Sequence, residues 1–271
     1  MSAVSAPAGA LRILAVSPHL DDAAFSAGGL LAALGAAGAR VAVATVFTRS
    51  VPDPVGVALT GQPDRELAAF IDHLSLRRAE DLAAMRHLGV HDVHHLDLPE
   101  AQHRGYVSTP DLFAGVHHDD GVGLRVQELL TPLVAAADVV LGPLALGGHA
   151  DHVIVRDAVR AVAGDRVAWW RDAPYALKLE TGLGGRQVPW SAADVTDVLP
   201  TKLAACASYS SQLGSHFGGP EGMVSALTRF AALEARRAGL PVERRAERLA
   251  TPPGLRAPDP WAALVRPARS G

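Results

Sequence analysis

The sequence predicts an α/β protein of Rossmann-like type, in which helices flank a parallel sheet to form three layers. Residues 12–16 form an apolar run of strand length, residues 22–38 have helical spacing and end at a glycine, and residues 40–47 form a second apolar run. A strand, a helix and a strand within about 35 residues make the βαβ unit of a parallel sheet. The uninterrupted apolar character of residues 41–46 is typical of a strand that is covered on both faces.

The same alternation continues to residue 170 and then weakens. In order, we expect a helix over 76–88, a strand over 93–98, a helix over 124–137, a strand over 138–141, a helix over 152–163, strands over 167–170, 175–179 and 195–198, and helices over 200–212 and 223–238. Residues 48–74 read as a loop with a short helix over 64–70. Residues 99–121 have no periodicity, and a loop of that length is assigned to substrate binding.

Composition indicates an ordinary globular chain. Its 271 residues, 49% hydrophobic and 20% charged, can bury a full core. We expect a single domain over residues 1–271, with a Pro- and Arg-rich tail from about residue 241 that is exposed to solvent. A net charge of −3 gives no electrostatic footprint for nucleic acid or for an anionic membrane, so the expected partner is a small molecule.

Cys206 is the only cysteine, which excludes an intrachain disulfide and a zinc site built on several thiolates of this chain. A metal would therefore be held by His, Asp or Glu. Residues 1–10 lack the pattern of a secretory signal, and the uncharged residues 23–39 are too short and too weakly apolar to span a membrane. We expect a cytoplasmic protein without a stable membrane anchor, and homo-oligomerisation is left open.

Two polar clusters each follow an expected strand. His19, Asp21 and Asp22 follow the first strand, and His149 and His152 follow a later one. In open α/β sheets, ligands bind in the crevice outside the carboxyl ends of the strands. The matching positions of the two clusters indicate that they meet at one site.

Each cluster alone has a plainer interpretation. Asp22 can be merely the N-cap of the helix that follows, and His149 and His152 can be polar residues at a helix start. Asp151 would then be a first-turn acid favoured by the helix dipole. The N-cap interpretation leaves His19 and Asp21 unexplained, and the occurrence of both clusters favours a metal site.

Two histidines and an aspartate around a divalent ion with open positions form a hydrolytic site, in which bound water becomes acidic. His19, Asp22 and His152 can supply these ligands. Asp21 is then free to act as a general base. His149 would stabilise an oxyanion or protonate a leaving amine.

These residues resemble the signatures of the LmbE/PIG-L deacetylase family. Pro18-His19-Leu20-Asp21-Asp22 is similar to its H-x-D-D motif, and His149-Ala150-Asp151-His152 to its H-x-D-H motif. The resemblance implies a Rossmann-like domain that holds zinc, or another divalent ion such as Fe²⁺, and removes an N-acetyl group from a glucosamine-like substrate. It implies the same roles for the five residues: His19, Asp22 and His152 bind the metal, Asp21 is the base and His149 is the acid or electrostatic group.

The resemblance extends through Arg77-Arg78-Ala79-Glu80, where Arg77 matches an arginine that the family uses on the sugar side of the substrate. The alternative is an exposed helical pair of Arg77 with Glu80, which would contribute little. Glu100, His103 and Arg104 are further candidates for substrate binding because they follow a strand end.

Three departures from the family pattern leave the substrate open. Leu20 replaces the usual proline, Ala23 the usual glutamate, and Gly147 stands where deacetylases of thiol pathways tend to carry a tyrosine. The expected function is hydrolysis of an N-acetyl or other N-acyl group on an amino sugar, in specialised metabolism or thiol-cofactor biosynthesis. The alternatives are an amidase of thiol conjugates and a metal-free binding module on the same fold.

Overall fold

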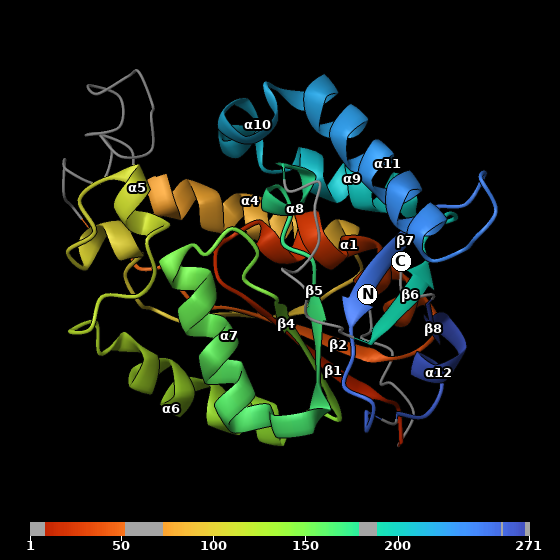
Figure 1. Cartoon of the computed structure of the whole chain (residues 1–271), viewed down its shortest axis with the longest axis horizontal. Coiled ribbons are helices and arrows are strands. Elements are labelled where there is room, and N and C mark those ends of the chain that lie inside the picture. The colour runs from red at the N-terminus through yellow and green to blue at the C-terminus, as the bar shows by residue number, and fades with distance from the viewer. Residues whose placement is uncertain (1–8, 52–72, 179–188, 256, 269–271) are drawn as a thin grey trace, which may run out of the picture.

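A mixed sheet of eight strands lies between two layers of helices (Figure 1). The computed structural model describes residues 9–51, 73–178, 189–255 and 257–268. Two hydrophobic clusters, one on each face of the sheet, form the core. The prediction of an α/β fold with three layers is confirmed.

The first part of the sheet is parallel and has the strand order β3-β2-β1-β4-β5. These strands are β1 (Arg12–Ser17), β2 (Arg40–Thr45), β3 (Asp92–His95), β4 (Val139–Pro143) and β5 (Val167–Trp170). The chain runs outward from β1 to β2 and β3, and then returns to place β4 on the other side of β1. This reversal between β1 and β4 is the position where open α/β sheets bind their ligands.

Helices cover both faces of the parallel strands, as the alternation of apolar segments predicts. On one face lie α1 (Asp22–Ala36), α4 (His73–His87), α9 (Leu199–Ala207), α10 (Ser210–Phe217) and α11 (Pro220–Arg237). On the other face lie α6 (Val122–Ala135) and α7 (Ala150–Ala163). No helix of the described residues is long and apolar enough to cross a membrane.

Three further strands extend the sheet beyond β5 in antiparallel pairings, in the order β7-β6-β8. They are β6 (Trp190–Asp194), β7 (Ala246–Ala250) and β8 (Val265–Pro267), and α12 (Trp261–Leu264) precedes the last of them. The expectation of a solvated tail from about residue 241 is therefore wrong for β7, all of which is buried. The charged residues of β7 suggest an exposed segment in the sequence, but they are buried against partners from distant segments of the chain.

Other expected elements after residue 98 also need correction. A strand expected over 175–179 is the short helix α8 (Tyr175–Lys178), and the strand expected over 195–198 lies earlier, at β6. The helix expected over 200–212 is divided between α9 and α10. The loop over 99–121 contains the 3₁₀ turn η1 (Ala101–His103) and the short helix α5 (Thr109–Leu112), and a 3₁₀ turn η2 (Gly164–Arg166) follows α7. The helix expected over 64–70 lies outside the described residues.

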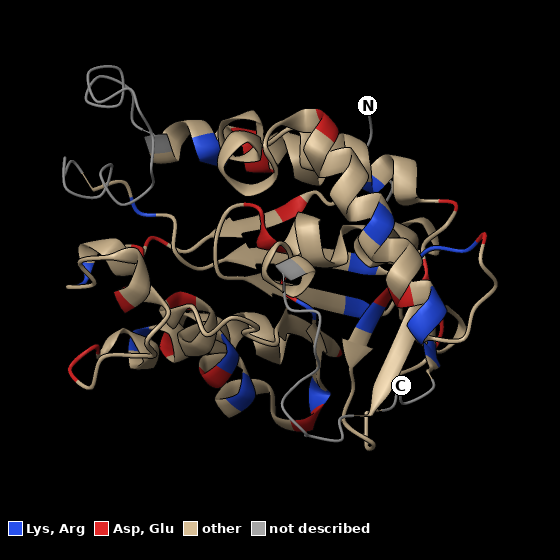
Figure 2. Ribbon diagram, turned by 45° about the horizontal axis from the view of Figure 1, so that its top comes forward, with Lys and Arg blue, Asp and Glu red and all other residues tan. Residues whose placement is uncertain are grey.

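Charged residues of both signs are interspersed along the described chain (Figure 2). This distribution agrees with the small net charge and gives no reason to revise the expectation of a small-molecule partner.

Helix α1 is the most buried helix of the fold and is fastened in its middle by Glu247 of β7. One carboxylate oxygen of Glu247 accepts from the Gly29 N–H at 3.0 Å and from Lys202 Nζ at 2.6 Å, and the other accepts from the Leu30 N–H at 2.8 Å. The close approach depends on Gly29, since a Cβ there would lie 2.9 Å from Val195 Cβ.

Replacement of Gly29 by alanine is therefore expected to destabilise the protein. The added methyl group would push α1 away from β7, and overpacking of this kind costs about 1–3 kcal/mol of unfolding free energy. Gly35, in the same helix, is the matched control because a Cβ there meets nothing within 4 Å. Gly35→Ala should leave stability unchanged or raise it by about 0.5–1 kcal/mol. Urea denaturation of both variants tests this, and equal midpoints would contradict it.

Candidate metal centre and active site

The two polar clusters meet at the carboxyl ends of the adjacent parallel strands β1 and β4. His19 lies in the turn between β1 and α1, Asp21 is the N-cap residue of α1, and Asp22 is the first residue of that helix. His149 is the N-cap residue of α7, and His152 lies in its first turn. Two helix N-termini therefore point at the site, and their dipoles favour the carboxylates held there.

The interpretation of Asp22 as merely a helix cap is wrong. The N-cap residue is Asp21, whose side chain makes no capping hydrogen bond. Ser17 has that function instead, because its hydroxyl accepts from the Ala23 N–H at 3.0 Å. The carboxylate of Asp22 turns toward the two histidines.

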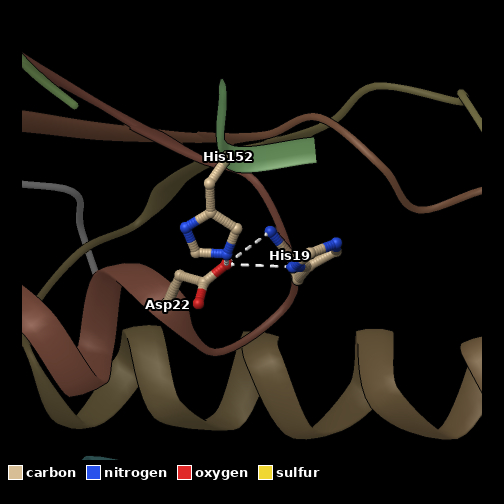
Figure 3. Close-up of side chains that lie close together, drawn as sticks. All are labelled: His19, Asp22 and His152. Atoms are coloured by element: carbon tan, nitrogen blue, oxygen red, sulfur yellow. Dashed lines mark hydrogen bonds and ion pairs between the residues drawn. The ribbon is translucent and has the colours of Figure 1, made fainter. Parts of the chain in front are cut away.

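His19, Asp22 and His152 converge so that one ligand atom from each lies within 4.8 Å of the others (Figure 3). Asp22 Oδ2 is 3.2 Å from His19 Nδ1 and 3.3 Å from His152 Nε2. In a tetrahedral zinc site with bonds of about 2.0–2.1 Å, neighbouring ligand atoms are separated by about 3.3 Å. Both distances from Asp22 Oδ2 to the histidines therefore match the spacing that such an ion requires.

The chemistry of the donor atoms fits a cation as well. Nε2 of His152 is fully buried and has no hydrogen-bond partner among the described residues, although Asp22 is close. A buried polar atom without a partner is costly. A metal ion at the centre of the three side chains would supply one.

Each of the two histidines is held through its other ring nitrogen by a buried carboxylate. Asp151 Oδ2 lies 2.9 Å from His19 Nε2, and Asp172 Oδ1 lies 2.8 Å from His152 Nδ1. Carboxylates in this position orient metal-binding imidazoles and make them better ligands. Asp172 is in turn held by the Leu146 N–H at 2.9 Å.

The carboxylates also set the protonation of the imidazoles. Burial acts to lower the pKa of His19, but hydrogen bonds to Asp151 and Asp22 raise it well above its ordinary value. Burial likewise acts to lower the pKa of His152, but the charge of Asp22 and the bond to Asp172 raise it to about 9. The negative charge of the carboxylates at this site must therefore be balanced, either by protons on the imidazoles or by a bound cation.

A second group, His19 with His149 and Asp151, also has metal-binding spacing. It is the weaker candidate because its atoms already have protein partners. Asp151 accepts from the Ala101 N–H at 3.0 Å and from Arg104 Nη2 at 2.7 Å, and His149 Nδ1 accepts from the Asp151 N–H at 3.2 Å.

His149 is a neutral hydrogen-bond donor in this arrangement. Burial and the charge of His19 lower the pKa of His149 to about 3. Because Nδ1 accepts a backbone hydrogen bond, the proton of the neutral ring is on Nε2. The ring centroid lies 5.2 Å from that of His19 and 5.5 Å from that of His152, beside the three ligands.

Asp21 is buried next to the ligands, and its Oδ2 atom makes no hydrogen bond with the described residues. Arg77 Nη2 lies 3.8 Å from this oxygen, and His216 Nε2 lies 3.7 Å from it. Arg77 also donates to Glu100 Oε1 at 2.8 Å. A buried carboxylate oxygen that makes no hydrogen bond with the described residues is well placed to take a proton from water.

Arg77 and Glu80 do not form the exposed helical pair that was the alternative to a site role. Both are buried, and each has distant partners. Glu80 accepts from the Ser210 hydroxyl at 2.8 Å, and from the Ser211 N–H at 2.9 Å and its hydroxyl at 2.6 Å. Glu80 therefore fastens α10 to α4, while Arg77 faces the site.

The candidates for substrate binding in the 99–121 loop differ in burial and in the contacts that they make. All three guanidinium nitrogens of Arg104 donate to protein acceptors, in particular Asp120, Asp151 and the Pro99 carbonyl. Its contacts indicate that it positions the loop and Asp151. Glu100 is buried against Arg77, and His103 is half-buried in η1. Substrate binding by these residues stays a prediction.

Sequence reasoning missed Asp172, Tyr175 and His216. Asp172 follows β5 directly, and the rule that places ligands after parallel strands could have identified it. Tyr175 packs on His152 with ring centroids 5.2 Å apart, but it was assigned to a strand. His216 lies on α10, far from either motif in the sequence, and no local signal marks it.

Comparison with known proteins agrees with this geometry. Residues 14–163, more than half of the chain, match the family model described as PIG-L, GlcNAc-PI de-N-acetylase. The chain is 36% identical over 217 residues to 2'-N-acetylparomamine deacetylase of Streptomyces fradiae, with 74% of this chain and 73% of that protein covered. It is 29% identical over 224 residues to 1D-myo-inositol 2-acetamido-2-deoxy-alpha-D-glucopyranoside deacetylase of Corynebacterium glutamicum (strain R), with 74% and 75% covered.

Among solved structures, the zinc-inhibited form of teicoplanin deacetylase Orf2 superposes with a TM-score of 0.67 at 25% identity, covering 88% of this chain and 96% of that one. The family match spans both motifs and the strands β1 and β4 that carry them. The chain therefore belongs to the PIG-L family of de-N-acetylases.

Proposed function

We propose that this protein is a metal-dependent deacetylase that removes the N-acetyl group from an amino sugar of specialised metabolism. The observation that carries the proposal is the convergence of His19, Asp22 and His152 at the spacing of a tetrahedral ion, with Asp21 and His149 beside them. The family to which the chain belongs supports the reaction. The names of its relatives, each an N-acetyl amino-sugar deacetylase, support the substrate class.

Zinc is the proposed ion. Two imidazoles and one carboxylate with positions left open are the usual donor set of catalytic zinc, and Fe²⁺ is the alternative for the same ligands. A divalent ion bound there polarises a water molecule and the acetyl carbonyl. His19, Asp22 and His152 would hold it, while Asp151 and Asp172 orient the two imidazoles.

The protein groups supply the proton transfers. Asp21 takes a proton from the attacking water as its oxygen bonds to the acetyl carbon. His149 donates a hydrogen bond from Nε2 to the acetyl oxygen as negative charge develops on it. The C–N bond then breaks as the nitrogen receives the proton held by Asp21, and the products are a free amine and acetic acid, which loses its proton to solvent to become acetate. His149 suits the hydrogen-bonding role better than that of an acid because its pKa is low.

An amidase of thiol conjugates uses the same chemistry on another substrate. It is less favoured because the relative with 36% identity is a deacetylase of an aminoglycoside-type sugar. The metal-free module is less favoured because the buried Nε2 of His152 makes no hydrogen bond with the described residues and has only Asp22, at 3.3 Å, to balance it. Cytoplasmic location and homo-oligomerisation stay predictions.

The direct test is acetate release from a panel of N-acetylated amino sugars and N-acyl thiol conjugates. The purified protein is stripped with a chelator and then reloaded with Zn²⁺ or Fe²⁺. We expect release of acetate from amino sugars that is lost on stripping and restored by the metal. Preference for the thiol conjugates would change the substrate, and full activity after verified metal removal would overturn the mechanism.

Asp21 and His152 are expected to have separable roles. Asp21→Asn removes the base but no ligand, so kcat should fall by about 10²–10⁴-fold with zinc content unchanged. His152→Ala removes a ligand and should lose both zinc and turnover. Elemental analysis beside the acetate assay distinguishes them. Near-normal turnover by Asp21→Asn would show that another group is the base.

Asp172 is expected to affect metal affinity through His152. Asp172→Asn keeps the size of the side chain but replaces the anionic acceptor of the His152 ring, so zinc affinity should fall about 10–100-fold. Asp157→Asn is the control, since Asp157 lies on the exposed side of the same helix as His152. Competition with a chromophoric chelator measures both affinities. Equal affinities in the two variants would exclude this role for Asp172.

A further inference from the structure

Two glycines in front of His149 bring aromatic residues from distant segments onto the active-site turn. Gly147 and Gly148 both have positive φ, 89° and 78°. A Cβ on Gly147 would lie 3.4 Å from Cβ and Cγ of Tyr175, and a Cβ on Gly148 would lie 3.7 Å from the Phe113 carbonyl oxygen. Tyr175 and the backbone of Phe113 therefore pack directly on the backbone that leads to His149.

Phe113, Tyr175 and His149 form what we call the aromatic wall. Ring centroids of Phe113 lie 5.2 Å from His149 and 5.6 Å from Tyr175, and Tyr175 lies 5.2 Å from the ligand His152. Phe113 is 37% exposed, whereas Tyr106 in the same loop is buried. The partly exposed Phe113 is therefore in direct ring contact with His149.

Side-chain contacts within the 99–121 loop hold the segment that carries Phe113 in place. Tyr106 stacks on His117 with centroids 4.0 Å apart, and His117 Nε2 lies 2.8 Å from Asp111 Oδ1. The Tyr106 hydroxyl donates to Asp120 at 3.0 Å, and Arg104 joins Asp120 to Asp151 beside the metal ligands. Because these contacts hold the loop in place, a ligand that packs on Phe113 has little ordering cost to overcome.

The remainder of the site is charged, with Asp21, Arg77 and Glu100 buried beside the ligands. A ligand for the whole site must therefore have both an apolar face and polar groups at its edge. A pyranose ring has this character, since its axial C–H groups form apolar faces and its hydroxyl groups lie around the rim. Such C–H groups pack on the electron-rich faces of aromatic rings.

We propose that the aromatic wall is the subsite for the sugar ring that carries the N-acetyl group, with the exposed Phe113 as a specificity-determining residue. The inference rests on the proposed function, because it names how the substrate of that reaction is held. Phe113 packs on the ring and takes no part in bond breaking. It contributes to binding of substrate and product alike.

The test compares Phe113→Ala and Phe113→Trp in the zinc-loaded protein, with Val107→Ala as the control. Val107 lies in the same loop, is 76% exposed and has no place in the wall. We measure KM and kcat for methyl N-acetylglucosaminide, and the affinity for the amine product, methyl glucosaminide, by calorimetry. An aromatic contact of about 0.5–1.5 kcal/mol corresponds to about 2–12-fold in affinity.

Phe113→Ala should raise KM and weaken product binding by that factor while kcat and zinc content stay unchanged. Phe113→Trp should retain binding, and Val107→Ala should match the natural protein. If the natural protein deacetylates the sugar but Phe113→Ala has the same KM and product affinity, the subsite is excluded and the proposed function stands. If the natural protein neither hydrolyses the substrate nor binds the product, both proposals are overturned.

Discussion

The concentration of carboxylates around two buried imidazoles is the constraint on which the site depends. Asp22, Asp151 and Asp172 each contact His19 or His152, and the buried Asp21 directly precedes Asp22 in the chain. So much negative charge in a buried place is unfavourable unless it is balanced. Protonated imidazoles can balance it, as their raised pKa values indicate, but a divalent cation at the centre does so with the correct ligand spacing.

The fold provides this arrangement through the reversal of strand order between β1 and β4. Adjacent parallel strands end side by side, so two short motifs more than a hundred residues apart deliver their side chains to one point. Arg104 then joins the loop over 99–121 to Asp151, and Glu80 fastens α10 near Asp21. The 99–121 loop and α10 are thereby tied to the residues of the candidate metal centre.

Much of the parallel sheet, and the convergence of His19, Asp22 and His152, could be predicted from the sequence, because both depend on local signals: apolar periodicity, and His and Asp shortly after strands. The long-range partners of several buried charges could not. Glu247 reads as a solvated charge until Lys202 and the backbone of α1 are seen to surround it. Arg77 and Glu80 suggest a pair in sequence, yet each has a closer partner elsewhere. Such contacts depend on tertiary structure, which short-range patterns do not encode.

The central claim is that His19, Asp22 and His152 hold one cation. The most direct measurement is the anomalous difference density of crystals of the zinc-loaded protein, collected on both sides of the zinc absorption edge. We expect one strong peak at about 2.0–2.2 Å from a ring nitrogen of each histidine and from an oxygen of Asp22. A zinc peak at another position, or none among these three side chains in a protein with verified zinc content, would contradict it.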